Sequence, residues 1–323
     1  MRFKRATILL ITVVLVLLGS HWLIKSYLAE KNEMDYLEEV FNNLDQIKSA
    51  SYYSTIMPFA PGDTIPHFIA KRFYEVYINP ADTFVGASFI YFSGKDYSEF
   101  GSCYDGNMRT IVNRERKTIE IDSFQFNPNS FRPLSAPLFV RAKRLFQYAF
   151  ETEDSLLIES IDFGDSIQFS LTIFDTLVDV IGNRIVHYPS LYGSSIGEVT
   201  KYDIWVNKSD GLPYRIRREM PTQLTIESIR NVKLNHLNIE NFKTSEHFPS
   251  DFRVYAYNRK KRVIPDNFEG RKAPDWVLCD KDSNLISLEG LKSKVVMIQF
   301  TGVSCGPCQA SVPFLKQLVT EYD

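Results

Sequence analysis

Apolar and polar residues alternate along the chain with two different periods, and each period predicts a different kind of element. From Met34 to Ile47 the apolar residues recur every three or four positions, which is typical of an amphipathic helix. From there to about Glu246 the period is two, most clearly over residues 166–173. Each alternating stretch predicts a strand that buries one of its faces.

Turn and cap residues divide this part of the chain further. Asp210 and Gly211 separate two alternating runs and predict a hairpin. Ser135 and Pro137 are favourable at a helix start, and the apolar residues after them fall along one helical side. The sequence therefore predicts an α+β fold for residues 26–252, with a helix first and then a large antiparallel sheet that contains a helical insertion.

The inward side of this sheet would carry many Phe, Tyr and Ile side chains. A long antiparallel sheet packed against helices can curl into a half-barrel, and the inward side chains then line an apolar trough. Alternatively they pack a closed core. Both alternatives stay open. A closed core has to be considered because apolar stripes at strand period belong to cores more often than to binding surfaces.

Residues 1–25 have the pattern of a transmembrane anchor. Arg2, Lys4 and Arg5 precede an apolar run that continues to Ile24, close to the roughly 20 residues that a helix needs to cross a bilayer. Because cationic flanks stay in the cytoplasm, we expect a single-pass inner-membrane protein with the bulk of the chain in the periplasm. A cleaved signal peptide is the alternative, although no clean small-x-small cleavage triplet follows the run.

The pattern changes again after a charged, aperiodic stretch at residues 253–272, which is expected to be a linker. Trp276 to Asp280 is predicted to be a strand that returns through a turn as Leu285 to Leu288. Val295 to Phe300 is a continuous apolar run and predicts a buried strand. A helical pattern follows Cys305, so residues 273–323 have the order strand, loop, cysteine, helix.

The sequence Cys305-Gly306-Pro307-Cys308 predicts a thiol–disulfide redox site. A cysteine at a helix N-terminus lies among unpaired backbone N–H groups at the positive end of the helix dipole, which lowers the pKa of its thiol. Cys305 is therefore the predicted nucleophile, and Cys308 is placed to attack the mixed disulfide that Cys305 forms. Gly306 lets the backbone approach closely, and Pro307 costs no hydrogen bond in a first turn.

The remaining cysteines, the histidines and the charge balance narrow the possible functions. A Cys-x-x-Cys is also half of many zinc sites, but no second Cys or His pair stands at a ligand spacing, so neither a metal nor a cofactor is predicted. Cys103 and Cys279 either pair with each other or are idle thiols. A formal net charge of -2 without a long basic run gives no reason to expect a nucleic acid partner.

Several motifs of the C-terminal part resemble the extracytoplasmic thioredoxin-like proteins of the TlpA/ResA type. They are Ala273-Pro274-Asp275-Trp276, the run from Ser287 to Phe300, and Cys305-Gly306-Pro307-Cys308. The resemblance implies a thioredoxin-like fold for residues 273–323, with Cys305 and Cys308 as the active pair. It also implies that Pro313 bends the active-site helix.

Three departures from that family pattern are visible. Gln299 stands where cytoplasmic thioredoxins hold a buried acid, so no proton acceptor is identified for Cys308. Ser304 and Thr301 replace aromatic residues near the first cysteine. The sequence ends at Asp323, before the further strands of the fold, so a C-terminally truncated sequence is expected.

A second, more diffuse resemblance covers the sheet region. The opening helix, Tyr104-Asp105-Gly106 and the stretch from Tyr202 to Glu219 resemble the LolA/LolB-type lipoprotein-carrier superfamily. In that family a half-barrel holds lipid chains, so the resemblance implies a hydrophobic ligand for residues 26–252.

Two functions are therefore expected. The first is a membrane-tethered, extracytoplasmic thiol–disulfide oxidoreductase that reduces or exchanges disulfides in exported proteins, with protein disulfides or dithiols as its substrates. The second is a lipid- or lipoprotein-binding sheet domain that carries an incomplete, inactive redox segment.

Overall fold

The structure is a computed structural model that describes residues 34–124, 134–188, 198–239, 242, 244–257, 270–280, 282–291, 295–299 and 306–322. The anchor expected at residues 1–25 lies outside these ranges. Within them, no helix combines the length and the apolar character needed to cross a membrane.

The described elements confirm an α+β fold that consists mostly of sheet. In chain order they are a helix at residues 34–45, β1 (Ser49–Phe59), β2 (Ala70–Ile78), β3 (Ala87–Ser93), β4 (Glu99–Tyr104), β5 (Arg109–Asn113), β6 (Thr118–Asp122), α2 (Leu138–Glu151), β7 (Leu156–Asp162), β8 (Ser166–Phe174), β9 (Leu177–Ile181), β10 (Arg184–Tyr188), β11 (Val199–Asn207), β12 (Leu212–Met220), β13 (Gln223–Leu234), the 3-10 turn η2 (Thr244–His247), β14 (Arg253–Ala256), β15 (Val277–Cys279), β16 (Leu285–Ser287) and α3 (Gly306–Tyr322).

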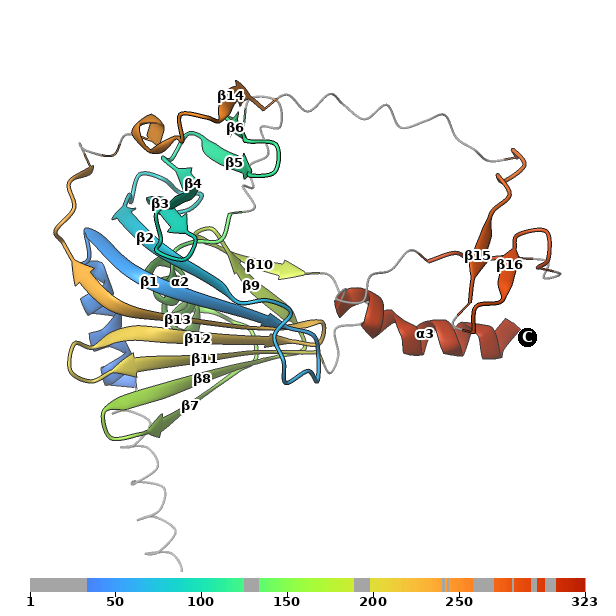
Figure 1. Cartoon of the computed structure of the whole chain (residues 1–323). Coiled ribbons are helices and arrows are strands. Elements are labelled where there is room, and N and C mark those ends of the chain that lie inside the picture. The colour runs from blue at the N-terminus through green and yellow to red at the C-terminus, as the bar shows by residue number, and fades with distance from the viewer. Residues whose placement is uncertain are drawn as a thin grey trace, which may run out of the picture.

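Twelve strands form one sheet in the order β14-β6-β5-β4-β3-β2-β1-β13-β12-β11-β8-β7, and Figure 1 shows its long strands side by side. The strands β9 and β10 form a separate hairpin, as do β15 and β16. The predicted antiparallel pairing is confirmed from β6 through to β7.

The edge strand β14 corrects two expectations, that residue 253 begins a linker and that the whole sheet is antiparallel. Arg253–Ala256 pairs with β6, with Val254 opposite Ile119, and this pair of strands is parallel. The carbonyl of Ile121 also accepts a hydrogen bond from the amide of Tyr257 at 2.8 Å. The charged composition of this stretch concealed the strand, because an edge strand with exposed side chains shows no alternating apolar pattern.

The hairpin predicted around Asp210 and Gly211 joins β11 and β12, whose register places Ile204 opposite Ile216. Gly211 adopts φ +64°, and a Cβ there would lie 2.3 Å from the side-chain nitrogen Nδ2 of Asn43. A glycine therefore fits both the turn and the contact with the opening helix.

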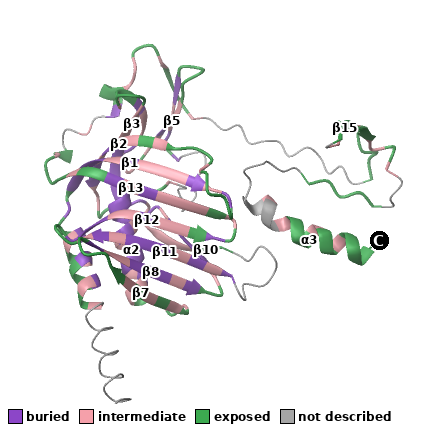
Figure 2. Ribbon diagram, turned by 60° about the horizontal axis from the view of Figure 1, so that its bottom comes forward, coloured by how far each residue is buried: buried purple, intermediate pink, exposed green. Residues whose placement is uncertain are grey.

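The inner face of the sheet is the face covered by α2 and by the opening helix, and it holds the main core. Figure 2 shows the buried positions concentrated on the long strands and on α2. The rings of Phe146 on α2 and Phe169 on β8 meet edge to face at 6.3 Å between centroids, and Tyr52 meets Phe139 in the same way at 5.6 Å. Tyr36 of the opening helix stacks on Phe169. Around these residues the aromatic side chains pack a closed core, one of the two alternatives raised by the sequence.

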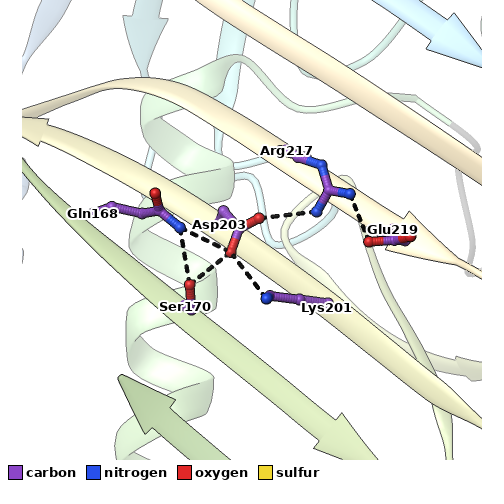
Figure 3. Close-up of polar contacts among 6 residues, drawn as sticks. All are labelled: Gln168, Ser170, Lys201, Asp203, Arg217 and Glu219. Atoms are coloured by element: carbon purple, nitrogen blue, oxygen red, sulfur yellow. Dashed lines mark hydrogen bonds and ion pairs between the residues drawn. The ribbon is translucent and has the colours of Figure 1, made fainter. Parts of the chain in front are cut away.

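The outer face carries a buried polar network that ties three strands together. Figure 3 shows Asp203 of β11 between Ser170 of β8 and Arg217 of β12. Ser170 donates to Oδ1 of Asp203 at 2.6 Å, and Nη1 of Arg217 donates to Oδ2 at 2.9 Å. Only 4% of Asp203 is exposed, so these charge-assisted hydrogen bonds replace its hydration.

A second, smaller core surrounds Cys103, which lies against Ile90, Phe100 and Ile119. Cys103 is a free, buried thiol and Cys279 is a free, exposed one, so the idle-thiol alternative is confirmed for both. Burial raises the pKa of Cys103 from 9.0 to about 11, although hydrogen bonds from Thr244 and Thr110 act in the opposite direction.

This shift predicts a pH-dependent contribution to stability. The folded state keeps the Cys103 thiol protonated while the unfolded chain ionises it, so the stabilisation is complete below pH 9.0 and is lost as the pH rises toward about 11. Between pH 8 and pH 10.5 the free energy of unfolding should fall by about 2 kcal/mol more in the parent than in Cys103→Ala, as measured by urea titration. Parallel pH profiles for the two proteins would contradict the assignment.

Candidate functional site

Helix α3 contains three of the four residues of the predicted Cys-Gly-Pro-Cys redox site. It begins at Gly306, directly after Cys305, and it contains Pro307 and Cys308 in its first turn. Cys308 is half-buried and disulfide-bonded. Cys305 lies outside the described residues. The first N–H groups of a helix have no partner within the helix, so Pro307 removes a donor that the helix does not use.

The second turn of α3 links the cysteine region to the preceding segment. Ser311 donates from Oγ to the carbonyl of Cys308 at 2.7 Å, and Nε2 of Gln299 donates to the same Oγ at 2.9 Å. The amide of Gln299 neither gains nor loses a proton near neutral pH. Gln299 therefore fixes position in this region and is no substitute for a carboxylic acid. Gln299 was identified from the sequence, but Ser311 was not, because its only signal is its place one turn after Cys308.

Pro313 lies inside α3, and the helix continues past it to Tyr322. Proline has no N–H to bond the carbonyl four residues earlier, which here belongs to Gln309, and its ring crowds that carbonyl. Both effects favour a bend at this point. The prediction that Pro313 lies within the helix after the cysteines is confirmed.

The hairpin before the cysteines is confirmed, but the strand after it is not. β15 and β16 pair antiparallel with Leu278 opposite Ile286, and Oδ1 of Asp280 accepts the amides of Asp282 and Asn284 in the turn. Residues 295–299 form no strand, and Val295 is 85% exposed. A continuous apolar run becomes a buried strand only when neighbouring strands and helices cover it. No strand within the described ranges pairs with this run.

The C-terminal segment that contains the cysteines is similar to known proteins. Residues 268–323 match the Redoxin family. This redoxin segment also matches the thiol-disulfide oxidoreductase ResA of Bacillus anthracis and that of Bacillus thuringiensis strain Al Hakam, each 36% identical over 53 residues. The match covers 16% of this chain and 31% of either relative, so the chain spans about a third of the length of these curated relatives.

The sheet region has structural neighbours of low similarity. A LolA superfamily protein from Nitrosomonas europaea aligns with 65% of this chain and 98% of its own, at 13% identity and a TM-score of 0.29. The lipoprotein LppX of Mycobacterium tuberculosis aligns with 64% of this chain and 97% of its own, at 9% identity and a TM-score of 0.29. With TM-scores this low, neither neighbour indicates what the sheet of this chain binds.

A cavity of about 420 Å³ opens on the inner face, and both apolar and charged side chains line it. Arg141 of α2 forms an ion pair with Glu227 of β13, whose other carboxylate oxygen accepts the hydroxyl of Ser54 at 2.8 Å. Arg218 of β12 pairs with Asp179 of β9. The apolar trough or closed core expected from the sequence did not include these charged side chains.

The tyrosines beside the cavity stay neutral at physiological pH. Burial raises the pKa of Tyr74 to about 12, while the neighbouring Arg72 lowers it. Burial also raises the pKa of Tyr202, whose hydroxyl donates to Oδ1 of Asp179 at 3.2 Å. The charged residues of the cavity were not predicted from the sequence, although Glu227 and Arg218 lie on the same strand faces as the buried Ile229 and Ile216, respectively. A charge at an inward position is the signal that was available.

Proposed function

We propose that this chain is a thiol–disulfide oxidoreductase whose active pair is Cys305 and Cys308. In this proposal residues 1–25 anchor the chain in the inner membrane, and everything after them lies in the periplasm. The observation that carries the proposal is the disulfide-bonded Cys308 in the first turn of α3, within a segment that matches the Redoxin family. The similarity of that segment to ResA supports the same chemistry.

The reaction begins with the Cys305 thiolate. It attacks one sulfur of a substrate disulfide, which forms a mixed disulfide and releases one substrate thiolate that takes up a proton. The Cys308 thiolate then attacks the sulfur of Cys305 and releases the second substrate thiolate. The substrate gains two electrons and two protons, and the protein ends with a Cys305–Cys308 disulfide. An external dithiol reductant returns the protein to its reduced form.

The start of α3 supplies the electrostatics of this sequence of steps. Backbone N–H groups and the positive end of the helix dipole favour a thiolate just before Gly306. Gln299 and Ser311 hold the segment before the cysteines against α3 without providing a carboxylate base. In this mechanism the proton of Cys308 is therefore accepted by solvent or by the departing substrate thiolate.

We assign the protein to disulfide reduction or exchange in exported proteins. Gly306 and Pro307 form the same dipeptide that thioredoxin carries between its cysteines, and thioredoxin is strongly reducing at about −270 mV. Ligand binding by the sheet is a second role within this proposal, in which the sheet is a half-barrel around the inner-face cavity. The cavity, which both apolar and charged side chains line, is the observation that favours that role.

A redox titration tests the assignment. The full chain in a Cys279→Ser background, which removes the exposed free thiol, is equilibrated in glutathione buffers and then alkylated with a mass-tagged maleimide. We expect one two-electron transition close to the potential of thioredoxin, about −270 mV, and its loss in a Cys305→Ser/Cys308→Ser variant. A midpoint near −120 mV, about the value of a strongly oxidising protein, would mean that the chain oxidises its substrates instead of reducing them. The absence of any transition would refute the proposal.

A further inference from the structure

We propose that the inner-face cavity binds a small organic anion, a carboxylate with a short apolar body, whose head is held by the guanidinium groups of Arg72, Arg141 and Arg218. This inference rests on the ligand-binding role proposed above for the same cavity, and it does not depend on the proposed redox chemistry. Three properties of the cavity favour such a ligand: the charge balance of its lining, the unpaired donors in the lining and the volume of the cavity.

The charges that line the cavity do not balance. Three guanidinium groups face two carboxylates, those of Asp179 and Glu227. The carboxylates are occupied by Arg218 and Arg141, respectively. Arg72 forms no ion pair among the described residues and instead donates to the hydroxyl of Tyr74 at 2.9 Å, while its guanidinium lies 4.4 Å from the ring centre of Tyr91. One positive charge is therefore left for a ligand to neutralise.

Two donors in the same lining lack acceptors. Nε of Arg141 and Nε of Arg218 are buried and have no hydrogen-bond partner within the described part of the chain. A buried donor without an acceptor costs free energy, and most such groups in folded proteins are satisfied. A carboxylate has two oxygens that accept hydrogen bonds from guanidinium groups in a matching planar geometry. An anionic head thus supplies both the missing charge and the missing acceptors.

The rest of the lining suits an apolar body attached to that head. Ile56, Phe68, Val180 and Ile216 contribute apolar surface to the cavity. Its volume of about 420 Å³ lies within the range of about 300 to 1,000 Å³ that is usual for small-molecule pockets. A cation would be repelled by Arg72, and a neutral ligand would leave the excess positive charge uncompensated. The lining therefore selects an anion with a short chain.

Titration calorimetry with octanoate, and with 1-octanol as its uncharged counterpart, tests this inference on the full chain. Octanoate should bind with one site per chain, and 1-octanol should bind at least about tenfold more weakly, because only the carboxylate engages the guanidinium groups. Arg72→Gln should weaken octanoate binding by about ten- to a hundredfold. Arg72 has no carboxylate partner in the described residues, so its replacement leaves no buried charge unpaired and the protein should remain folded.

The matched control is Arg215→Gln, on the same sheet but on the outer face. Arg215 also has a buried Nε without a hydrogen-bond partner in the described residues, but its guanidinium stacks on Trp205 and does not line the cavity. Octanoate affinity should be unchanged in this variant. Equal affinities for octanoate and 1-octanol, no detectable octanoate binding, or equal losses in Arg72→Gln and Arg215→Gln would each overturn the inference.

Discussion

Replacement of Cys305 by serine should remove all insulin reduction above the rate of the dithiothreitol buffer alone. Serine cannot form the thiolate that attacks the substrate, so the first step of the proposed reaction is lost. Replacement of Cys308 should also stop turnover, but for a different reason. In Cys308→Ser the nucleophile still attacks, and the mixed disulfide then persists because no second thiol resolves it.

Trapping of the mixed disulfide separates the two roles. After incubation with oxidised insulin and acid quenching, non-reducing gels should show a covalent adduct with Cys308→Ser and none with Cys305→Ser. Cys279→Ser is the control, because it removes an exposed free thiol that the mechanism does not use, and its insulin reduction should equal that of the parent. Equal partial activity in both active-site variants, or adducts with both, would contradict the assigned roles.

Loss of Glu227 should destabilise the sheet by about 3 to 5 kcal/mol, which is the usual cost of removing one partner from a buried ion pair. Only 7% of the Glu227 side chain and 18% of the Arg141 side chain are exposed. In Glu227→Ala the guanidinium of Arg141 is left in the protein without its counterion, and the hydroxyl of Ser54 loses its acceptor. Urea unfolding followed by far-UV circular dichroism measures the change.

Two further variants distinguish the effect of an unpaired buried charge from the general effect of shortening a side chain. Arg141→Met combined with Glu227→Leu removes both charges and should recover most of the lost stability, since well-packed apolar pairs often replace buried ion pairs without cost. Glu99→Ala breaks the exposed pair of Glu99 and Arg114, whose side chains are 49% and 43% exposed, and should cost less than about 1 kcal/mol. A double variant as unstable as Glu227→Ala would refute the explanation.

The sequence by itself determined the elements whose formation depends on neighbours close in the chain. The helical period predicted the opening helix and α3, the alternation over residues 166–173 predicted β8, and the turn at Asp210 and Gly211 predicted the hairpin of β11 and β12. The Cys-Gly-Pro-Cys motif and its place at a helix start were also legible, because a short motif and the helix that follows it are both local features.

Only the tertiary structure decided which side chains meet across long sequence separations. It placed β14 in parallel beside β6, it left Val295 exposed, and it brought Arg141 and Glu227 together although 86 residues separate them. The physical reason is that period and composition report the local conformation and the preferred burial of a side chain, whereas pairing and charge compensation depend on the chain path between distant segments. The cavity with its excess positive charge exists only because that path brings three arginines to one face.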